Sequence, residues 1–208
     1  MSAAVASRLV DALDQSVART GKVLIHIYGG EPLTNLPAMA SMVHRARANA
    51  PGRFSFGITT NGTILTDEIL DVLETGDFEI TLSIDGPAEI HDSCRRTKDD
   101  APTHDLVLEF LRAVRERTGC RVRGSAVVRP GWGLAEACGY LRSLGVDTLK
   151  AQVVRVPADS PFALSPDERR RYERDLAAQA ARVIDDLESG EPPRDGRFTP
   201  QVLQLLTG

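Results

Sequence analysis

The sequence predicts an α/β fold in which a curved, open sheet of about five parallel strands carries helices on its outer face. Segments with strand character alternate with segments with helix character along the 208 residues, which is typical of right-handed βαβ crossovers. Most of the predicted strands are apolar on one face and polar on the other, whereas parallel strands covered on both faces are apolar throughout. The 42% hydrophobic content fits one domain with a sizeable core.

Five segments have strand character. They are KVLIHIY (22–28), RFSFGITT (53–60), FEITLSI (78–84), RVRGSAVV (121–128) and TLKAQVVRV (148–156). The third alternates strictly, with Phe78, Ile80, Leu82 and Ile84 on one face and Glu79, Thr81, Ser83 and Asp85 on the other. This alternation predicts a concave side that is open to water and holds a ligand.

Helices are predicted before, between and after the strands. Their ranges are 3–19, 37–50, 66–76, 103–117, 134–145 and 165–190, and residues 197–208 are expected to add a short one. Thr66, Thr103 and Ser165 are expected N-caps, Pro166 suits the first helical position, and Gly76 marks a helix end. We expect a partial barrel over residues 1–190 and a linker with a short helix over 191–208.

Composition excludes several classes of function. The net charge of -4, with both signs mixed, argues against nucleic acid as a partner. No apolar run approaches the ~20 residues of a membrane span, and the N-terminus lacks the apolar core of a signal peptide, so we expect a cytoplasmic protein. The three cysteines Cys94, Cys120 and Cys138 have no metal-binding spacing and read as ordinary cytosolic thiols.

Polar and glycine residues recur where the predicted strands end, which is where α/β folds bind ligands. They are Gly29, Gly30, Glu31, Thr60, Asn61, Gly62, Ser83, Asp85, Gly86, Arg129 and Arg155. The alternative is that such loops are polar in any case and use glycine only to turn the chain.

Four segments together resemble the core of the radical S-adenosylmethionine (SAM) enzymes. They are GGEPLTN (29–35), TTNGTILTDEIL (59–70), SIDGPAEIHD (83–92) and PTHD (102–105). The sequence is most similar to the branch that modifies sulfatases and ribosomally made peptides and carries a C-terminal SPASM domain. The resemblance implies a partial (β/α) barrel, SAM as cofactor, a [4Fe-4S] cluster, and a peptide or protein as substrate.

The resemblance also implies which residues hold SAM. The carbonyls of Gly29 and Gly30 and the carboxylate of Glu31 would accept hydrogen bonds from the methionyl ammonium. Ser83 and Asn61 would face the ribose or the carboxylate, Arg95 or Arg96 would pair with the carboxylate, and apolar residues near Val127, Val128 and Val154 would line the adenine. The expected cofactor-binding set is Gly29, Gly30, Glu31, Pro32, Asn61, Ser83, Asp85 and Arg96. Structural alternatives exist, because Asn61-Gly62 also suits a turn, Ser83 a strand and Arg96 a solvated surface.

The sequence departs from the family pattern at the cluster. A CxxxCxxC loop should supply three thiolates to the iron–sulfur cluster, but no cysteine precedes Gly29, and the three later cysteines are too widely spaced to replace it. We therefore expect no metal ligands, weakened SAM affinity and no radical catalysis by this chain alone, and we assign no catalytic residue.

Two interpretations follow from this departure. The chain is either a radical SAM core that lacks both ends, including the SPASM-type domain, or a cluster-less homologue that acts as a peptide-binding partner or scaffold. The first is favoured because strand 22–28 would otherwise be an apolar sheet edge without protecting residues. A second copy of the chain or a partner protein would be expected to cover that edge.

Two other classes of function remain open. A SAM- or nucleotide-binding protein without radical chemistry has little support, because no GxGxxG or P-loop pattern follows a strand and GWG (131–133) is a weak signal. Acid–base hydrolysis would use Glu31, Asp85, His91 and Asp92, although an adjacent His-Asp pair more often forms local hydrogen bonds.

Overall fold

The structure, a computed structural model, describes residues 1–17 and 21–196. The chain divides into two compact units. Unit 1 comprises Met1–Leu82 and Asp105–Arg121, and unit 2 comprises Ser83–His104 and Val122–Gly208. The predicted short helix over 197–208 and the predicted linker end lie outside the described residues, so the boundary at residue 190 stays a prediction.

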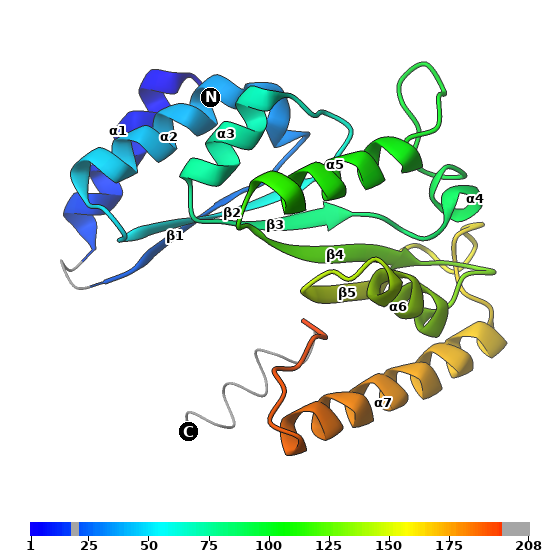
Figure 1. Cartoon of the computed structure of the whole chain (residues 1–208). Coiled ribbons are helices and arrows are strands. Elements are labelled where there is room, and N and C mark those ends of the chain that lie inside the picture. Colours follow the sequence, from blue (N-terminus) through cyan, green and yellow to red (C-terminus); the bar gives the residue numbers. More distant parts are fainter. Residues whose placement is uncertain (18–20, 197–208) are drawn as a thin grey trace. The chain divides into compact units, whose positions relative to one another are not determined.

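Five strands form one open sheet, as predicted (Figure 1). The strands are β1 (Val23–Ile27), β2 (Phe54–Thr60), β3 (Phe78–Ser83), β4 (Arg121–Val128) and β5 (Thr148–Val153), and they follow one another in that order. The pairs β1–β2, β2–β3 and β4–β5 are parallel. Among the described strands β1 stands at one end of the order, and the covering of its free edge stays a prediction.

The helices of unit 1 largely match the predicted ranges. They are α1 (Ala3–Ser16), α2 (Leu36–Asn49), α3 (Asp67–Thr75) and α5 (His104–Arg117), the last beginning at a residue of unit 2. Thr66 caps α3, because its hydroxyl accepts from the Ile69 N–H, and Gly76 ends the helix in an extended conformation. The short 3₁₀ helix η1 (Pro32–Asn35) was not predicted.

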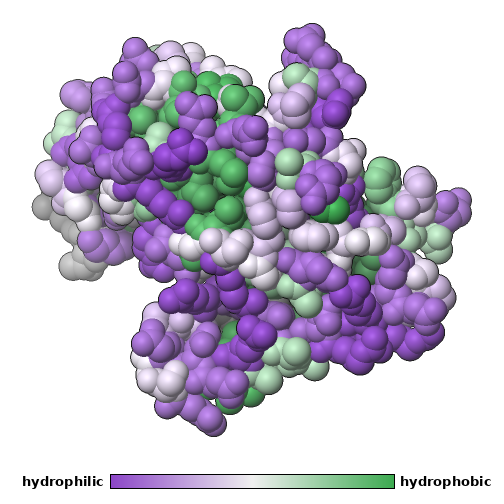
Figure 2. Space-filling view, turned by 45° about the vertical axis from the view of Figure 1, so that its right-hand side comes forward, coloured by the Kyte–Doolittle hydropathy of each residue, from purple (hydrophilic) through white to green (hydrophobic). Residues whose placement is uncertain are grey.

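The helices of unit 2 are α4 (Ala88–His91), α6 (Leu134–Ser143) and α7 (Pro166–Glu188). Ser165 and Glu168 form a reciprocal capping box at the start of α7, which confirms the predicted cap. The short helix α4 was not predicted. No helix within the described ranges is long and apolar enough to cross a membrane, and the face of the molecule in Figure 2 is mainly hydrophilic.

The strands bury one face and expose part of the other, as their alternation predicts. In β3, Phe78, Ile80 and Leu82 are buried, whereas the side chains between them are partly exposed. In β4 the same pattern buries Val122 and Val128. The side chains that alternate with these buried residues are partly or fully exposed in both strands.

Gly62 follows β2 at a position that only glycine fits. Its φ of 68° lies in the left-handed region, and a Cβ added there would lie 2.6 Å from Cδ1 of Leu82. Positive φ and close packing thus act against any side chain at this turn.

We predict that Gly62→Ala lowers the free energy of unfolding by about 1–3 kcal/mol, because backbone strain adds to the clash with Leu82. Urea unfolding measures the effect. Gly119→Ala is the control, since a Cβ at Gly119 meets nothing within 4 Å. Equal stability of the two variants would contradict the prediction.

Candidate functional site

The turn after β1 leaves its backbone open. Gly29 and Gly30 have φ values of 111° and 51°, which non-glycine residues rarely adopt. Both residues are exposed, and a Cβ at either would meet nothing within 4 Å. Glycine is needed here for backbone conformation, and the space beside the turn stays free for a ligand.

The Glu31 carboxylate joins the end of β1 to the end of β2. Its Oε1 accepts hydrogen bonds from the Leu33 N–H at 3.1 Å and from the Thr60 hydroxyl at 2.7 Å. Its Oε2 accepts from the Asn61 N–H at 2.8 Å. An ionised carboxylate has about four acceptor positions, so these three bonds leave one position, on Oε2, for a further donor.

Asn61 and Pro32 shape this part of unit 1. The Asn61 side-chain oxygen accepts from the Thr63 N–H at 2.9 Å and from the Thr63 hydroxyl at 2.8 Å, which forms an Asx turn. Pro32 is buried in the first turn of η1. The structure thus places Gly29, Gly30, Glu31, Pro32 and Asn61 at one corner of unit 1.

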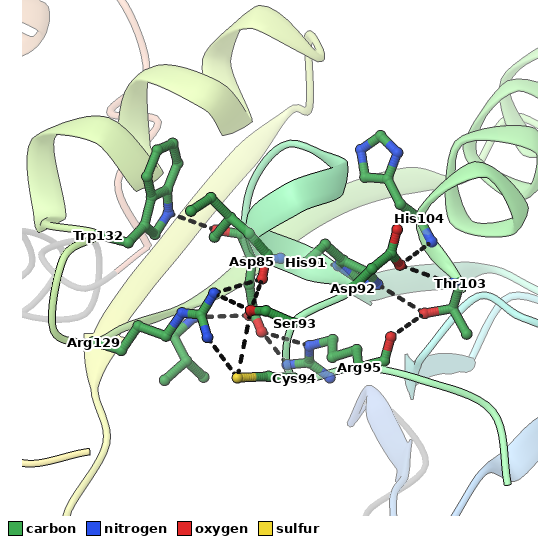
Figure 3. Close-up of polar contacts among 12 residues, drawn as sticks. Asp85, His91, Asp92, Ser93, Cys94, Arg95, Thr103, His104, Arg129 and Trp132 are labelled. Carbon is green, nitrogen blue, oxygen red and sulfur yellow. Dashed lines mark hydrogen bonds and ion pairs between the residues drawn. The ribbon is translucent and has the colours of Figure 1, made fainter. Parts of the chain in front are cut away.

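Asp85 in unit 2 is a buried, paired carboxylate (Figure 3). Arg95 binds it through two hydrogen bonds of 2.7 Å and 3.2 Å, and the Val127 N–H donates to Oδ1 at 2.9 Å. The Trp132 indole N–H donates to the Asp85 carbonyl at 2.8 Å. Asp85 therefore forms hydrogen bonds with β4 and with the loop after it. The positive charge of Arg95 is paired with the Asp85 carboxylate.

His91 is fixed as a neutral side chain beneath Asp85. The Asp85 N–H donates to Nδ1 at 3.3 Å, and the Thr103 hydroxyl donates to the Arg95 carbonyl at 2.8 Å. That hydroxyl has only one proton, which it donates to the Arg95 carbonyl. Nε2 of His91 lies 3.1 Å from the hydroxyl oxygen and is therefore protonated and donates this hydrogen bond. Burial, reinforced by the nearby Arg95 charge, lowers the pKa of His91 to about 4.

Asp92 binds the chain that leads into α5. Its Oδ1 accepts from the Thr103 N–H at 2.8 Å and from the His104 N–H at 2.9 Å. The Thr103 hydroxyl donates to the Arg95 carbonyl, and its predicted role as the cap of this helix stays a prediction. His91 and Asp92 thus act as a local hydrogen-bonding device, the reading that the sequence favoured over acid–base hydrolysis.

The remaining predicted residues of unit 2 differ in their surroundings. Arg96 is bound to its own loop, by Nε to the Asp92 carbonyl at 2.8 Å and by an ion pair of 2.9 Å with Asp100. Ser83 is half-buried at the end of β3. Trp132 was not predicted from the sequence as a partner of Asp85. The only feature that pointed to this position was the GWG triplet after β4.

A pocket of about 640 Å³ lies in unit 2 beyond the end of β5. Its walls include Val154, Arg155, Leu164 and Tyr172, so of the three predicted adenine-lining residues it contains Val154. Val128 is buried in the core. A pocket of this size suits a small ligand with an apolar body.

The cysteines do not fit an iron–sulfur cluster. Cys94 is exposed, Cys120 half-buried and Cys138 buried. Burial raises the pKa of the Cys120 thiol, whose Sγ contacts the Leu73 carbonyl at 3.3 Å. Within residues 1–17 and 21–196, no group of three His, Cys, Asp or Glu side chains could hold a metal ion.

The environment of His91 predicts how stability depends on pH. Its pKa is about 4 when folded and 6.5 when unfolded, so the unfolded chain binds more protons as pH falls below 6.5. We predict that the free energy of unfolding falls by about 2 kcal/mol between pH 7.5 and pH 5 because of this residue.

Urea unfolding followed by Trp132 fluorescence measures this dependence. His91→Gln is the comparison, because it retains a buried hydrogen-bonding side chain and cannot titrate. Its stability should change less between the two pH values than that of the wild type. Equal changes in both proteins would show that His91 is not buried in its neutral form.

Comparison with known proteins identifies the family. The model of the radical SAM superfamily matches residues 4–144. The chain is 32% identical over 109 residues to the serine-type anaerobic sulfatase-maturating enzyme of Bacteroides thetaiotaomicron. This aligned region covers 51% of this chain and 26% of that protein. It is 25% identical over 99 residues to the radical SAM cyclopropyl synthase TigE of Paramaledivibacter caminithermalis, covering 48% of this chain and 20% of that protein.

A solved structure shares the fold. Native anSMEcpe with bound AdoMet and Cp18Cys peptide superposes with a TM-score of 0.75 at 18% identity, covering 93% of this chain and 55% of that one. The chain thus spans about half of that structure and a smaller share of the two relatives. The family model covers most of the chain, and the chain belongs to the radical SAM superfamily.

Proposed function

We propose that this chain is the SAM-binding core of an enzyme that modifies a peptide or protein side chain. The similarity to a sulfatase-maturating enzyme supports this substrate class. A related fold with bound AdoMet and peptide supports both ligands. The corner Gly29–Glu31 would receive the methionyl end of SAM.

The free acceptor position of Glu31 carries this proposal. Three internal donors fix the carboxylate, so it needs no rearrangement to meet a ligand. The remaining position on Oε2 suits an ammonium donor, and a hydrogen bond between two charged groups is among the strong ones. The exposed glycines before it leave room for the aminoacyl chain.

The cluster that the family implies is a different matter, because the residues present do not fit it. The chain offers no group of three thiolates within its described part. The same misfit supports the second candidate function, a cluster-less homologue that binds peptide as a partner or scaffold.

We predict that Glu31→Gln lowers SAM affinity about tenfold or more, since it replaces a charge-assisted hydrogen bond with a neutral one. Calorimetry with SAM and with 5′-methylthioadenosine, which lacks the aminoacyl end, measures the effect. The affinity for methylthioadenosine should stay the same. Glu109→Gln, an exposed glutamate of α5 in unit 1, controls for the lost charge. Identical SAM titrations for wild type and Glu31→Gln would remove Glu31 from the site.

We predict that the 208 residues alone do not cleave SAM after anaerobic treatment with iron and sulfide, because no three thiolates converge. Visible absorption and iron analysis measure cluster content, and chromatography measures 5′-deoxyadenosine. Stoichiometric cluster together with 5′-deoxyadenosine would contradict the prediction. The triple variant Cys94→Ala, Cys120→Ala, Cys138→Ala serves as the blank for iron bound without a cluster.

A further inference from the structure

The open face of β1 presents three large side chains next to the Gly29–Glu31 corner. Leu24, His26 and Tyr28 alternate with the buried Val23 and Ile25. Leu24 is 62% exposed and Tyr28 is 80% exposed. Parallel strands are normally covered on both faces, so an imidazole and a phenol left open on this face need a physical explanation.

The structure holds His26 in one orientation. His26 is the register partner of Gly57 on β2. A Cβ on Gly57 would lie 2.4 Å from Nδ1 of His26, so the ring occupies the space that any other residue would fill. Nε2 lies 3.2 Å from the hydroxyl oxygen of Thr59, which follows Gly57 on the same face of β2.

The orientation determines what the ring can offer a ligand. Nδ1 lies against Gly57 and Nε2 lies beside Thr59, while His26 as a whole remains exposed. The Tyr28 ring follows at a centroid distance of 6.5 Å and an angle of 39°. The exposed rings of His26 and Tyr28 and the exposed Leu24 side chain therefore form a partly apolar surface beside the Thr59 hydroxyl.

We propose that His26 contacts the substrate of this barrel, an extended peptide segment with an aromatic or aliphatic side chain, and that Gly57 and Thr59 are its positioning residues. This inference rests on the proposed function, because that function makes the ligand a peptide. Preorganised side chains bind with a smaller entropy loss than mobile ones. Gly57 supplies this order by having no side chain, and Thr59 supplies it through its hydroxyl.

The test uses the full chain and a phage-displayed library of random dodecamer peptides, selected on the wild type in the presence of SAM. Selected peptides should be rich in aromatic and aliphatic residues. We expect His26→Ala to weaken their binding about tenfold and Thr59→Val roughly fivefold, in line with the loss of packing and of one hydrogen bond.

Gly57→Ala is the decisive variant, because it removes no functional group and only displaces the ring. It should weaken peptide binding about as much as His26→Ala, while His44→Ala, an exposed histidine of α2, should have no effect. Equal peptide binding by wild type, His26→Ala and Gly57→Ala, or a library that yields no binder, would overturn the inference.

Calorimetry with SAM on the same variants separates this inference from the proposed function. SAM affinity should be unchanged by His26→Ala and lowered by Glu31→Gln. If peptide binding depends on His26 but the chain does not bind SAM, the proposed role of the Gly29–Glu31 corner is wrong and the peptide contact stands. If SAM affinity depends on Glu31 but peptide affinity is the same in the wild type and His26→Ala, the peptide contact is wrong and the proposed role of the Gly29–Glu31 corner stands.

Discussion

The carboxylate of Glu31 is the constraint on which the candidate site depends. Parallel strands end with backbone N–H groups that have no partner in the sheet, and a buried, unpaired N–H is costly. Glu31 accepts the N–H groups of Leu33 and Asn61 and the hydroxyl of Thr60. One side chain thereby fixes the ends of β1 and β2, and the open glycine turn before it can remain exposed without loosening the strands.

Unit 2 contains the same device in a stronger form. Asp85 follows β3, accepts the Val127 N–H of β4 and also carries a bidentate Arg95. Its charge is neutralised locally, and His91 lies against its backbone as a neutral side chain. Glu31 and Asp85 therefore have a structural role, because both carboxylates accept hydrogen bonds from the backbone. Only an acceptor position left over, as on Oε2 of Glu31, is available for a ligand.

The sequence predicts what depends on local pattern. Alternation in β3 and caps such as Thr66 and Ser165 follow from side chains a few residues apart, so the structure confirms them. The network around Asp85 could not be predicted in the same way, because Asp85 and Trp132 are joined by tertiary packing. For the same reason the sequence offered Arg95 as a partner of the SAM carboxylate, whereas the structure pairs it with Asp85, and nothing in the sequence indicated that the His26 ring fills the space beside Gly57.

Binding SAM and reducing it depend on different physical features. Binding the ammonium requires acceptors and an open backbone, which one turn of a few residues provides. Reduction requires three thiolates that converge on one cluster, and here one thiol is exposed, one half-buried and one buried. Because Glu31 is also needed to hold two strands together, the Gly29–Glu31 turn would persist in a chain without radical chemistry. The turn therefore bears only on the proposed binding of SAM, whereas reduction of SAM depends on the cysteines.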